Sequence, residues 1–252
     1  FPAMRYWKPF TKDVAQAAEA WGATDAILLP LYPQFSTTTT ASSLGEWRKS
    51  SNLPTSTICC YPAGAQFAQA HADAILKTWR DAGSPERPRL LFSAHGLPQS
   101  VVDRGDPYQW QVEQSVAAVW KLLPSDWEYR ICYQSRVGPM KWIGPSTEEE
   151  IHRAAADGVG LIVSPIAFVS EHVETLVELD IEYGHLAKSL QLPFYLRTPA
   201  LGPDPRFIDA LADLVERALS APGKVQSETG GRLCPAAHGL CAQAHIGLGA
   251  AR

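Results

Sequence analysis

Cysteine is scarce in this chain, with five among 252 residues, an odd number that includes one adjacent pair. Such a set does not form the framework of a small disulfide-bonded secreted protein, so we expect a reducing, cytoplasmic location. No stretch approaches the ~18–20 consecutive apolar residues that a membrane-spanning helix needs. Charged residues make up 19% of the chain and the net charge is −4, which gives no reason to expect a nucleic-acid partner. The composition indicates a globular protein of one large or two modest domains.

Short apolar runs do occur, and they alternate with stretches of helical spacing. Predicted strands lie at 4–10, 25–32, 56–60, 89–94, 127–133, 160–169 and 194–197. Predicted helices lie at 11–22, 66–80, 107–123, 147–157 and 205–219, together with an acidic helix from residue 170 to 183. This alternation predicts an α/β fold of doubly wound parallel sheets with helices on both faces. Glycine, serine and proline at 83–88 break the pattern and mark a domain boundary.

The acidic stretch carries Glu174, Glu178 and Glu182 at intervals of four residues, with Ser170 as the predicted N-cap. On an α-helix this spacing stacks the carboxylates nearly in line, drifting by about 40° per step. Residues 171–183 contain no Lys or Arg that would offset the repulsion. Two interpretations remain open from these residues: an acidic surface helix, or a carboxylate row that receives a divalent cation.

A second strand end carries a histidine. The run 89–94 is followed at once by His95, Gly96, Leu97 and Pro98. Ligands of open α/β sheets bind at the carboxyl ends of the strands, so His95 lies where a functional side chain is expected. A histidine that is merely hydrogen-bonded is the structural alternative. Two strand ends, one with an imidazole and one with carboxylates, together favour a site.

Three blocks carry a resemblance to a known family. They are SAHGLP at 93–98, YQSRVGPMKWIGPSTEEEI at 133–151 and PIAFVSEHVETLVELDIEY at 165–183. In order and separation they resemble the signature blocks of the ferrochelatases, and the similarity extends from residue 4 to about residue 214. Ferrochelatases carry a further N-terminal portion, so the resemblance implies that this sequence is a fragment.

The resemblance implies a chelatase fold of two doubly wound (Rossmann-like) parallel-sheet lobes around a cleft, with the first lobe incomplete. We therefore expect the C-terminal part of the first lobe at 1–85, the second lobe at 86–221, and a flexible C-terminal tail with two cysteines at 222–252. The implied activity is that of a lyase that inserts Fe²⁺ into protoporphyrin IX to form protohaem, the terminal step of haem biosynthesis. Iron is a substrate, and the reaction requires no cofactor.

By resemblance, His95 and Glu174 match the two central active-site residues of the family, and both are metal-ligand candidates. The imidazole suits either proton acceptance or Fe²⁺ ligation, and the sequence leaves these roles open. Glu178 matches a member of the family's acidic path, and Glu182 continues that row as a further metal candidate. The family's acidic helix also contains a π-type widening.

Candidate porphyrin-binding residues lie in two places. Met140 and Trp142 belong to a loop bracketed by glycine and proline, where a rigid aromatic side chain can form a pocket wall. Ser135, with Gln134 and Arg136, lies at the end of the preceding strand. Arg5 and Tyr6 match an Arg-Tyr pair that lines the family's pocket.

Three alternatives to this function remain open. The first is the same chemistry on another ring, either coproporphyrin or a cobalt-accepting tetrapyrrole. The second is a non-catalytic tetrapyrrole or metal binder. The third is a phosphate- or sugar-binding protein that uses backbone N–H groups of the hydroxyl-rich loop at 37–43.

Some ferrochelatases bind a [2Fe–2S] cluster through C-terminal cysteines and one internal cysteine, and such a cluster takes four ligands. The tail offers Cys234 and Cys241, whereas the internal position of the animal enzymes falls at Ala70. A cysteine at 59, 60 or 132, or a histidine at 238, is the remaining source of ligands, and a tail with two free thiols is the alternative. The resemblance also implies peripheral membrane contact, whereas the oligomeric state is not readable.

Overall fold

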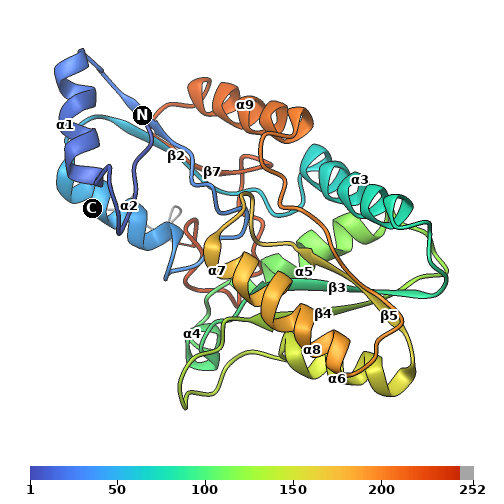
Figure 1. The fold of residues 1–252 in the computed structure, drawn as a ribbon. Helices are drawn as coiled ribbons and strands as arrows, with labels where there is room; N and C mark the ends of the chain where they lie inside the picture. The colour runs from blue at the N-terminus through green and yellow to red at the C-terminus, as the bar shows by residue number, and fades with distance from the viewer. Residues whose placement is uncertain (245–252) are drawn as a thin grey trace. The chain divides into compact units, whose positions relative to one another are not determined.

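The computed structural model describes residues 1–244, in which strands and helices alternate along most of the chain (Figure 1). The strands are β1 (Ala26–Leu28), β2 (Thr55–Cys60), β3 (Pro88–His95), β4 (Glu128–Gln134), β5 (Gly160–Pro165), β6 (Tyr195–Arg197) and β7 (Val225–Ser227). The helices are α1 (Thr11–Trp21), α2 (Thr40–Ser50), α3 (Ala65–Asp81), α4 (Gln99–Asp103), α5 (Tyr108–Trp120), α6 (Thr147–Asp157), α7 (Val173–Leu176), the π-helix η1 (Val177–Glu182), α8 (Tyr183–Ser189) and α9 (Pro205–Leu219). None of the described helices is long and apolar enough to span a lipid bilayer.

The chain divides into two compact units, each built from discontinuous segments. Unit 1 contains residues 1–61, 104–111 and the chain from 211 onward, and unit 2 contains residues 62–103 and 112–210. The unit boundaries differ from the predicted domain boundaries near residues 85 and 221, because the units are defined by spatial contacts and not by chain order.

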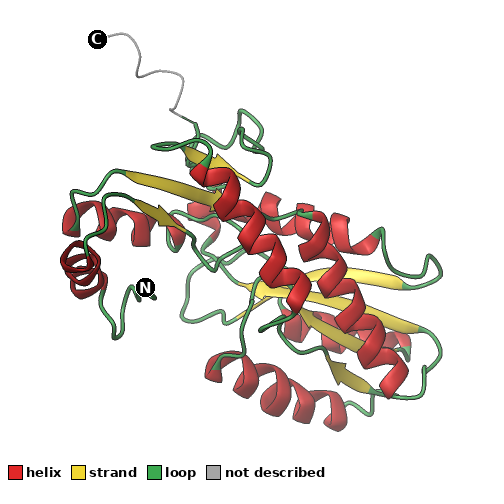
Figure 2. Cartoon of the chain, turned by 90° about the horizontal axis from the view of Figure 1, so that it is seen from above, coloured by secondary structure: helices red, strands yellow, loops and turns green. Residues whose placement is uncertain are grey.

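Unit 2 is organised around a four-stranded parallel sheet in the order β4-β3-β5-β6. The central strand β3 pairs with β4 along its whole length, so that His95 lies opposite Gln134 at the end of the ladder. Helix α6 packs on one face of the sheet and α3 lies on the other, and Figure 2 shows helices on both sides of these strands. Burial on both faces explains why β3 and β5 are continuous apolar runs. The predicted parallel, doubly wound sheet is confirmed.

Local sequence signals set helix α6. Ser146 accepts a hydrogen bond from the Glu149 backbone N–H, and the Glu149 side chain accepts one from the Ser146 N–H. This reciprocal capping box satisfies two N–H groups that the first turn leaves free. Gly158 ends the helix at φ 65°, a left-handed conformation that glycine adopts without a steric cost.

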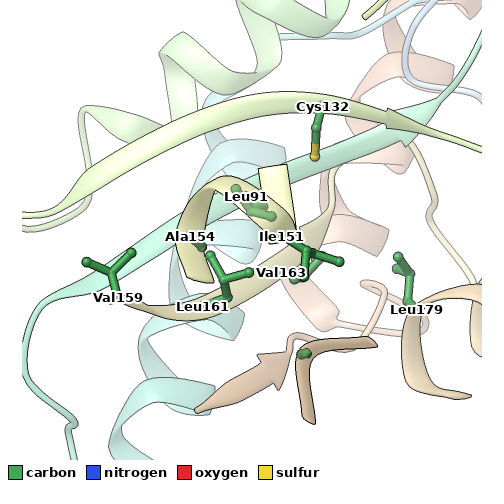
Figure 3. Close-up of a cluster of buried hydrophobic side chains, with 9 residues drawn as sticks. Leu91, Cys132, Ile151, Ala154, Val159, Leu161, Val163 and Leu179 are labelled. Atoms are coloured by element: carbon green, nitrogen blue, oxygen red, sulfur yellow. The ribbon is translucent and has the colours of Figure 1, made fainter. Parts of the chain in front are cut away.

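The core of unit 2 also anchors the acidic segment (Figure 3). Leu179, fully buried, reaches from η1 into the cluster that packs between the sheet and α6. The acidic segment is therefore attached to the sheet through an apolar contact. The other buried members of the cluster are Leu91, Cys132, Ile151, Ala154, Val159, Leu161, Val163 and Ala187.

Unit 1 contains a three-stranded parallel sheet in the order β1-β2-β7. Strand β7 lies within the predicted flexible tail and pairs with β2, which places Val225 opposite Thr57. Residues 222–244 of that tail contain this short strand and two buried cysteines, which the polar composition did not indicate. The last eight residues of that tail, 245–252, lie outside the described residues.

Two further expectations are corrected at the N-terminal end. Residues 4–10 form an isolated bridge between Met4 and Phe10 and not a strand. Strand β1 is limited to three residues within the predicted run 25–32. Strand β7 and the short helix α4 were not predicted.

Candidate active site

His95 ends β3, and its ring orientation follows from one hydrogen bond. Its Nδ1 lies 2.8 Å from the carbonyl oxygen of Gly96. A carbonyl oxygen only accepts, so Nδ1 carries the proton and Nε2 of the neutral ring keeps its lone pair. Nε2 lies 3.6 Å from Oε1 of Glu174, and both side chains are about half exposed, at 43% and 54%. The structure thus brings together the two residues that the sequence analysis made central.

Gly96 fixes the surroundings of His95. Its N–H donates to the Gln134 carbonyl at 2.8 Å, across the end of β3 and β4. A Cβ atom at this position would lie 2.9 Å from that carbonyl oxygen and 3.3 Å from Cε3 of Trp142. Only glycine permits this approach, so the loop that carries Trp142 packs directly beside the residue that follows the histidine.

The acidic segment begins later than predicted. The N-cap of α7 is His172, whose Nδ1 accepts a hydrogen bond from the Glu174 N–H at 3.3 Å. The prediction of Ser170 as the N-cap is wrong, because the chain stays extended at His172 and turns helical only at Val173. After one turn the helix widens into η1, the π-type segment that the resemblance implied.

Glu178 lies in this π-helix, and both of its carboxylate oxygens are hydrogen-bonded. Its Oε1 accepts hydrogen bonds from the Ser135 N–H at 2.7 Å and the Tyr183 hydroxyl at 2.8 Å. Its Oε2 accepts from the Ser135 hydroxyl at 2.6 Å and from Nε2 of Gln134 at 3.0 Å. Glu178 is therefore bound at the end of β4, four donors to one carboxylate. Burial, followed by the Glu178 charge, raises the pKa of Tyr183, so this hydroxyl stays a donor.

Other groups hold the next residues of η1. Arg197, at the end of β6, forms ion pairs with Asp180 and with Glu171, the latter at 3.0 Å. The Tyr195 hydroxyl donates to the Leu179 carbonyl at 2.7 Å. Glu182, the last residue of η1, is exposed. The three carboxylates of the predicted row therefore differ in their surroundings: Glu174 lies beside His95, Glu178 is bound at the end of β4, and Glu182 is exposed.

The chain matches one protein family over most of its length. The ferrochelatase family model matches residues 1–219. A ferrochelatase of Hyphomonas neptunium is 52% identical over 246 residues, which are 98% of this chain and 69% of that protein. A ferrochelatase of Phenylobacterium zucineum is 55% identical over 244 residues, with 96% and 71% covered. The chain belongs to the ferrochelatase family.

The fold of this ferrochelatase-family chain also resembles a solved structure, SirB from Bacillus subtilis with Fe³⁺. The TM-score is 0.62 with 15% sequence identity, and the match covers 84% of this chain and 78% of that chain. At this identity the likeness concerns the fold alone, and it agrees with the two parallel sheets. The chelatase-like fold class is confirmed.

The candidate porphyrin residues lie in both units. In unit 2, Met140 is 55% exposed, and Trp142 is half-buried with a buried Nε1 that has no hydrogen-bond partner among residues 1–244. In unit 1, Nε of Arg5 donates to the Ser42 hydroxyl at 3.0 Å, and its guanidinium lies 4.7 Å from the centre of the Tyr6 ring. Their contact with porphyrin stays a prediction.

A buried carboxylate that sequence reasoning missed holds the hydroxyl-rich loop of unit 1. Oδ2 of Asp106 accepts from the Thr37 N–H at 2.7 Å, the Thr37 hydroxyl at 2.6 Å and the Ser36 hydroxyl at 3.1 Å. The chain's own carboxylate thus uses the N–H group that a bound phosphate would need. No local signal could reveal this, since Asp106 lies 69 residues after Thr37.

Unit 1 also gathers buried thiols. The sulfur atoms of Cys59 and Cys60 lie 3.3 Å apart, and Nε2 of Gln111 donates to the Cys234 sulfur at 3.2 Å. The Cys234 thiol, with a smaller contribution from the charge of Arg232, lowers the pKa of Cys241. Within the described part of the chain, no three His, Cys, Asp or Glu side chains are arranged to hold a metal ion.

Proposed function

We propose that this chain is a lyase that inserts Fe²⁺ into protoporphyrin IX to give protohaem, the terminal step of haem biosynthesis. Its membership of the ferrochelatase family makes a porphyrin and iron the substrates. The observation that carries the proposal is the 3.6 Å approach of His95 Nε2 to Glu174 Oε1 at the end of a parallel strand.

Metal insertion makes demands that this pair can meet. The two pyrrole N–H protons must leave, and the metal ion must exchange water for nitrogen ligands. The lone pair of His95 Nε2 is available to accept a pyrrole proton. The carboxylate of Glu174 then stabilises the imidazolium that forms, because an opposite charge within about 4–6 Å favours the charged state.

The same geometry also suits metal delivery. Zinc binds imidazole nitrogen and carboxylate oxygen at roughly 2.1 Å. Two such ligands 3.6 Å apart subtend about 120° at the ion, close to a tetrahedral angle. His95 and Glu174 are therefore the residues that we propose as catalytic and as first contacts of the metal. Glu178 and Glu182 are proposed as nearby negative charges that favour entry of a cation.

The porphyrin is proposed to contact the loop of Met140 and Trp142. An exposed thioether and a half-buried indole provide the apolar surface that a flat aromatic ring requires. Ser135 was predicted to join this group. Its hydroxyl donates to Glu178, and its contact with the porphyrin stays a prediction.

Multiple-turnover kinetics test this function. The assay follows fluorescence of zinc protoporphyrin from protoporphyrin IX and Zn²⁺, with coproporphyrin as a parallel substrate. We expect many equivalents of product per chain and a higher kcat/KM for protoporphyrin. A single equivalent would identify a carrier, and a preference for coproporphyrin would replace the proposed substrate.

We propose that the chain binds no iron–sulfur cluster and that metal insertion requires none. Cys59, Cys60, Cys234 and Cys241 are all buried in unit 1, and the sulfur atoms of Cys59 and Cys60 lie 3.3 Å apart. The tail supplies only Cys234 and Cys241, and the internal ligand position of the animal enzymes is Ala70. Purification without oxygen, followed by measurement of iron and acid-labile sulfide, tests this. Two iron and two sulfide ions per chain would contradict it.

We also propose peripheral membrane contact through unit 1. Tyr6 and Trp7 are 74% and 75% exposed, and amphipathic aromatic side chains of this kind enter the water–lipid interface. Cosedimentation with anionic vesicles should fall in a Trp7→Ser variant, and equal binding of the two proteins would contradict the proposal.

A further inference from the structure

The Glu178 carboxylate is held by an unusually complete set of donors. Oε1 receives the Ser135 N–H and the Tyr183 hydroxyl, and Oε2 receives the Ser135 hydroxyl and the Gln134 amide. The donors come from the end of β4 and from the first residue of α8. Each oxygen is thus bound from two directions, which fixes both the position and the rotation of the carboxylate.

Ser135 makes two of these bonds from a conformation that serine rarely adopts. Its φ of 58° lies in the left-handed region, which glycine and asparagine prefer. In this conformation the N–H and the hydroxyl both reach one carboxylate, at 2.7 and 2.6 Å. An unfavourable backbone conformation is retained where surrounding contacts hold it in place. Here the left-handed conformation of Ser135 allows its two hydrogen bonds to Glu178.

A buried chain of hydrogen bonds supports Gln134. Its Oε1 accepts from the Ser93 hydroxyl at 2.8 Å, so its amide N–H₂ points toward Glu178. The Ser93 proton is used at Gln134, so the Thr147 hydroxyl, 3.0 Å away, donates to the Ser93 oxygen, and the Cys132 sulfur lies 3.3 Å from the Thr147 oxygen. These side chains are fully or almost fully buried. The donor that meets Glu178 is therefore fixed by the core of unit 2.

We infer that Ser135, together with Gln134 and Tyr183, is a positioning residue that acts through Glu178. This inference rests on the proposed metal insertion. A carboxylate with four donors is a poor metal ligand and a poor proton acceptor, since its lone pairs are already used. It serves instead as a fixed charge that anchors the start of η1, one helical turn after Glu174. Holding this turn keeps the Glu174 carboxylate at the His95 ring.

A double-mutant cycle tests the inference. Ser135→Ala should lower kcat/KM for Zn²⁺ about tenfold, because it removes a charge-assisted hydrogen bond whose loss corresponds to about a tenfold change in an equilibrium or rate constant. Glu178→Ala should lower it at least as much. The double variant should be no slower than Glu178→Ala alone, since Ser135 would then have no group to position. If kcat/KM of the double variant falls by the product of the two single-variant effects, the inference is overturned.

Two further variants separate the hydroxyl contact from backbone strain. Ser135→Gly relieves the left-handed backbone but removes the hydroxyl, so we expect it to be as slow as Ser135→Ala. Wild-type kinetics of Ser135→Gly would overturn the inference. Tyr183→Phe removes one donor with little change in shape, and we expect a several-fold smaller kcat with KM for porphyrin unchanged. A change in porphyrin KM alone would contradict a role through Glu178.

The control is Ser189→Ala. The Ser189 hydroxyl is exposed and donates to the Leu186 carbonyl within α8, so wild-type kinetics are expected. If the wild-type chain shows no turnover, the proposed function fails, and the same cycle is measured on urea unfolding. Non-additive losses of stability would then support the interaction of Ser135 with Glu178, and additive losses would contradict it. If the wild-type chain turns over and the effects of the two substitutions on kcat/KM multiply in the double variant, the positioning role of Ser135 is refuted. The proposed function is then unaffected.

Discussion

His71 is a titratable side chain in an apolar position, and it makes stability depend on pH. It lies on α3 with 1% of its surface exposed and packs edge-on against Phe67, with ring centres 4.7 Å apart. Its buried Nε2 has no hydrogen-bond partner among the described residues. Burial lowers the pKa of His71 from its ordinary value of 6.5 to about 3, because the charged ring would lose its hydration.

The sign and size of the effect follow from linkage. Above pH 6.5 the ring is neutral in both the folded and the unfolded chain, so it contributes no pH dependence. Below pH 6.5 the unfolded chain binds the proton first, and the free energy of unfolding falls until the folded pKa near 3 is reached. At 1.36 kcal/mol per pH unit, the loss is about 2 kcal/mol at pH 5 and at most about 5 kcal/mol.

Urea unfolding between pH 7.5 and pH 5 measures this loss, with His71→Leu as the comparison. Leucine fills the apolar site without titrating, so the wild-type chain should lose about 2 kcal/mol more than the variant over this range. His185→Gln, which alters an exposed histidine, should follow the wild-type curve. Parallel curves for the wild type and His71→Leu would refute a buried neutral histidine.

Four more substitutions test the packing of unit 2. Leu179→Ala should lower the free energy of unfolding by about 3 kcal/mol, since it leaves a cavity where η1 meets the core, and a loss below about 1 kcal/mol in urea unfolding would contradict this. Gly160→Ala should be strongly destabilising, because the new Cβ would lie 2.2 Å from the Phe194 ring. At Gly184 a new Cβ meets nothing within 4 Å, so Gly184→Ala should raise the free energy of unfolding by up to about 1 kcal/mol. A higher melting temperature for Gly160→Ala than for Gly184→Ala would contradict both expectations. Gly96→Ala should lower kcat about tenfold with a smaller change in stability, because its Cβ displaces the end of β4 beside the histidine, and unchanged zinc insertion would show that this approach is irrelevant.

Short-range and topological signals explain what the sequence could predict. The capping box of α6 requires only residues three positions apart. His95 was predicted as a site residue because the carboxyl ends of parallel strands meet at one sheet edge. Its approach to Glu174 then needed only the order of strands and helices and a helix that follows β5. The capping box and the strand-end position of His95 can both be recognised without knowledge of tertiary contacts.

Long-range contacts explain what the sequence could not predict. The bonds that turn Glu178 toward β4 come from Ser135, 43 residues away, and a uniform four-residue spacing carries no trace of them. The N-cap at His172 prevailed over Ser170 although serine is the better capping residue, because the backbone is still extended at His172. Strand β7 has three residues and is identified only by its pairing with β2.

The central claim is that His95 and Glu174 act together on the incoming metal and the porphyrin. The most direct measurement is the rate of zinc protoporphyrin formation by His95→Ala, Glu174→Gln and the double variant, each first shown to be folded by circular dichroism. We expect kcat of His95→Ala to fall at least about a hundredfold, and the double variant to be no slower than the slower single variant. Wild-type turnover by a folded His95→Ala variant would contradict the claim.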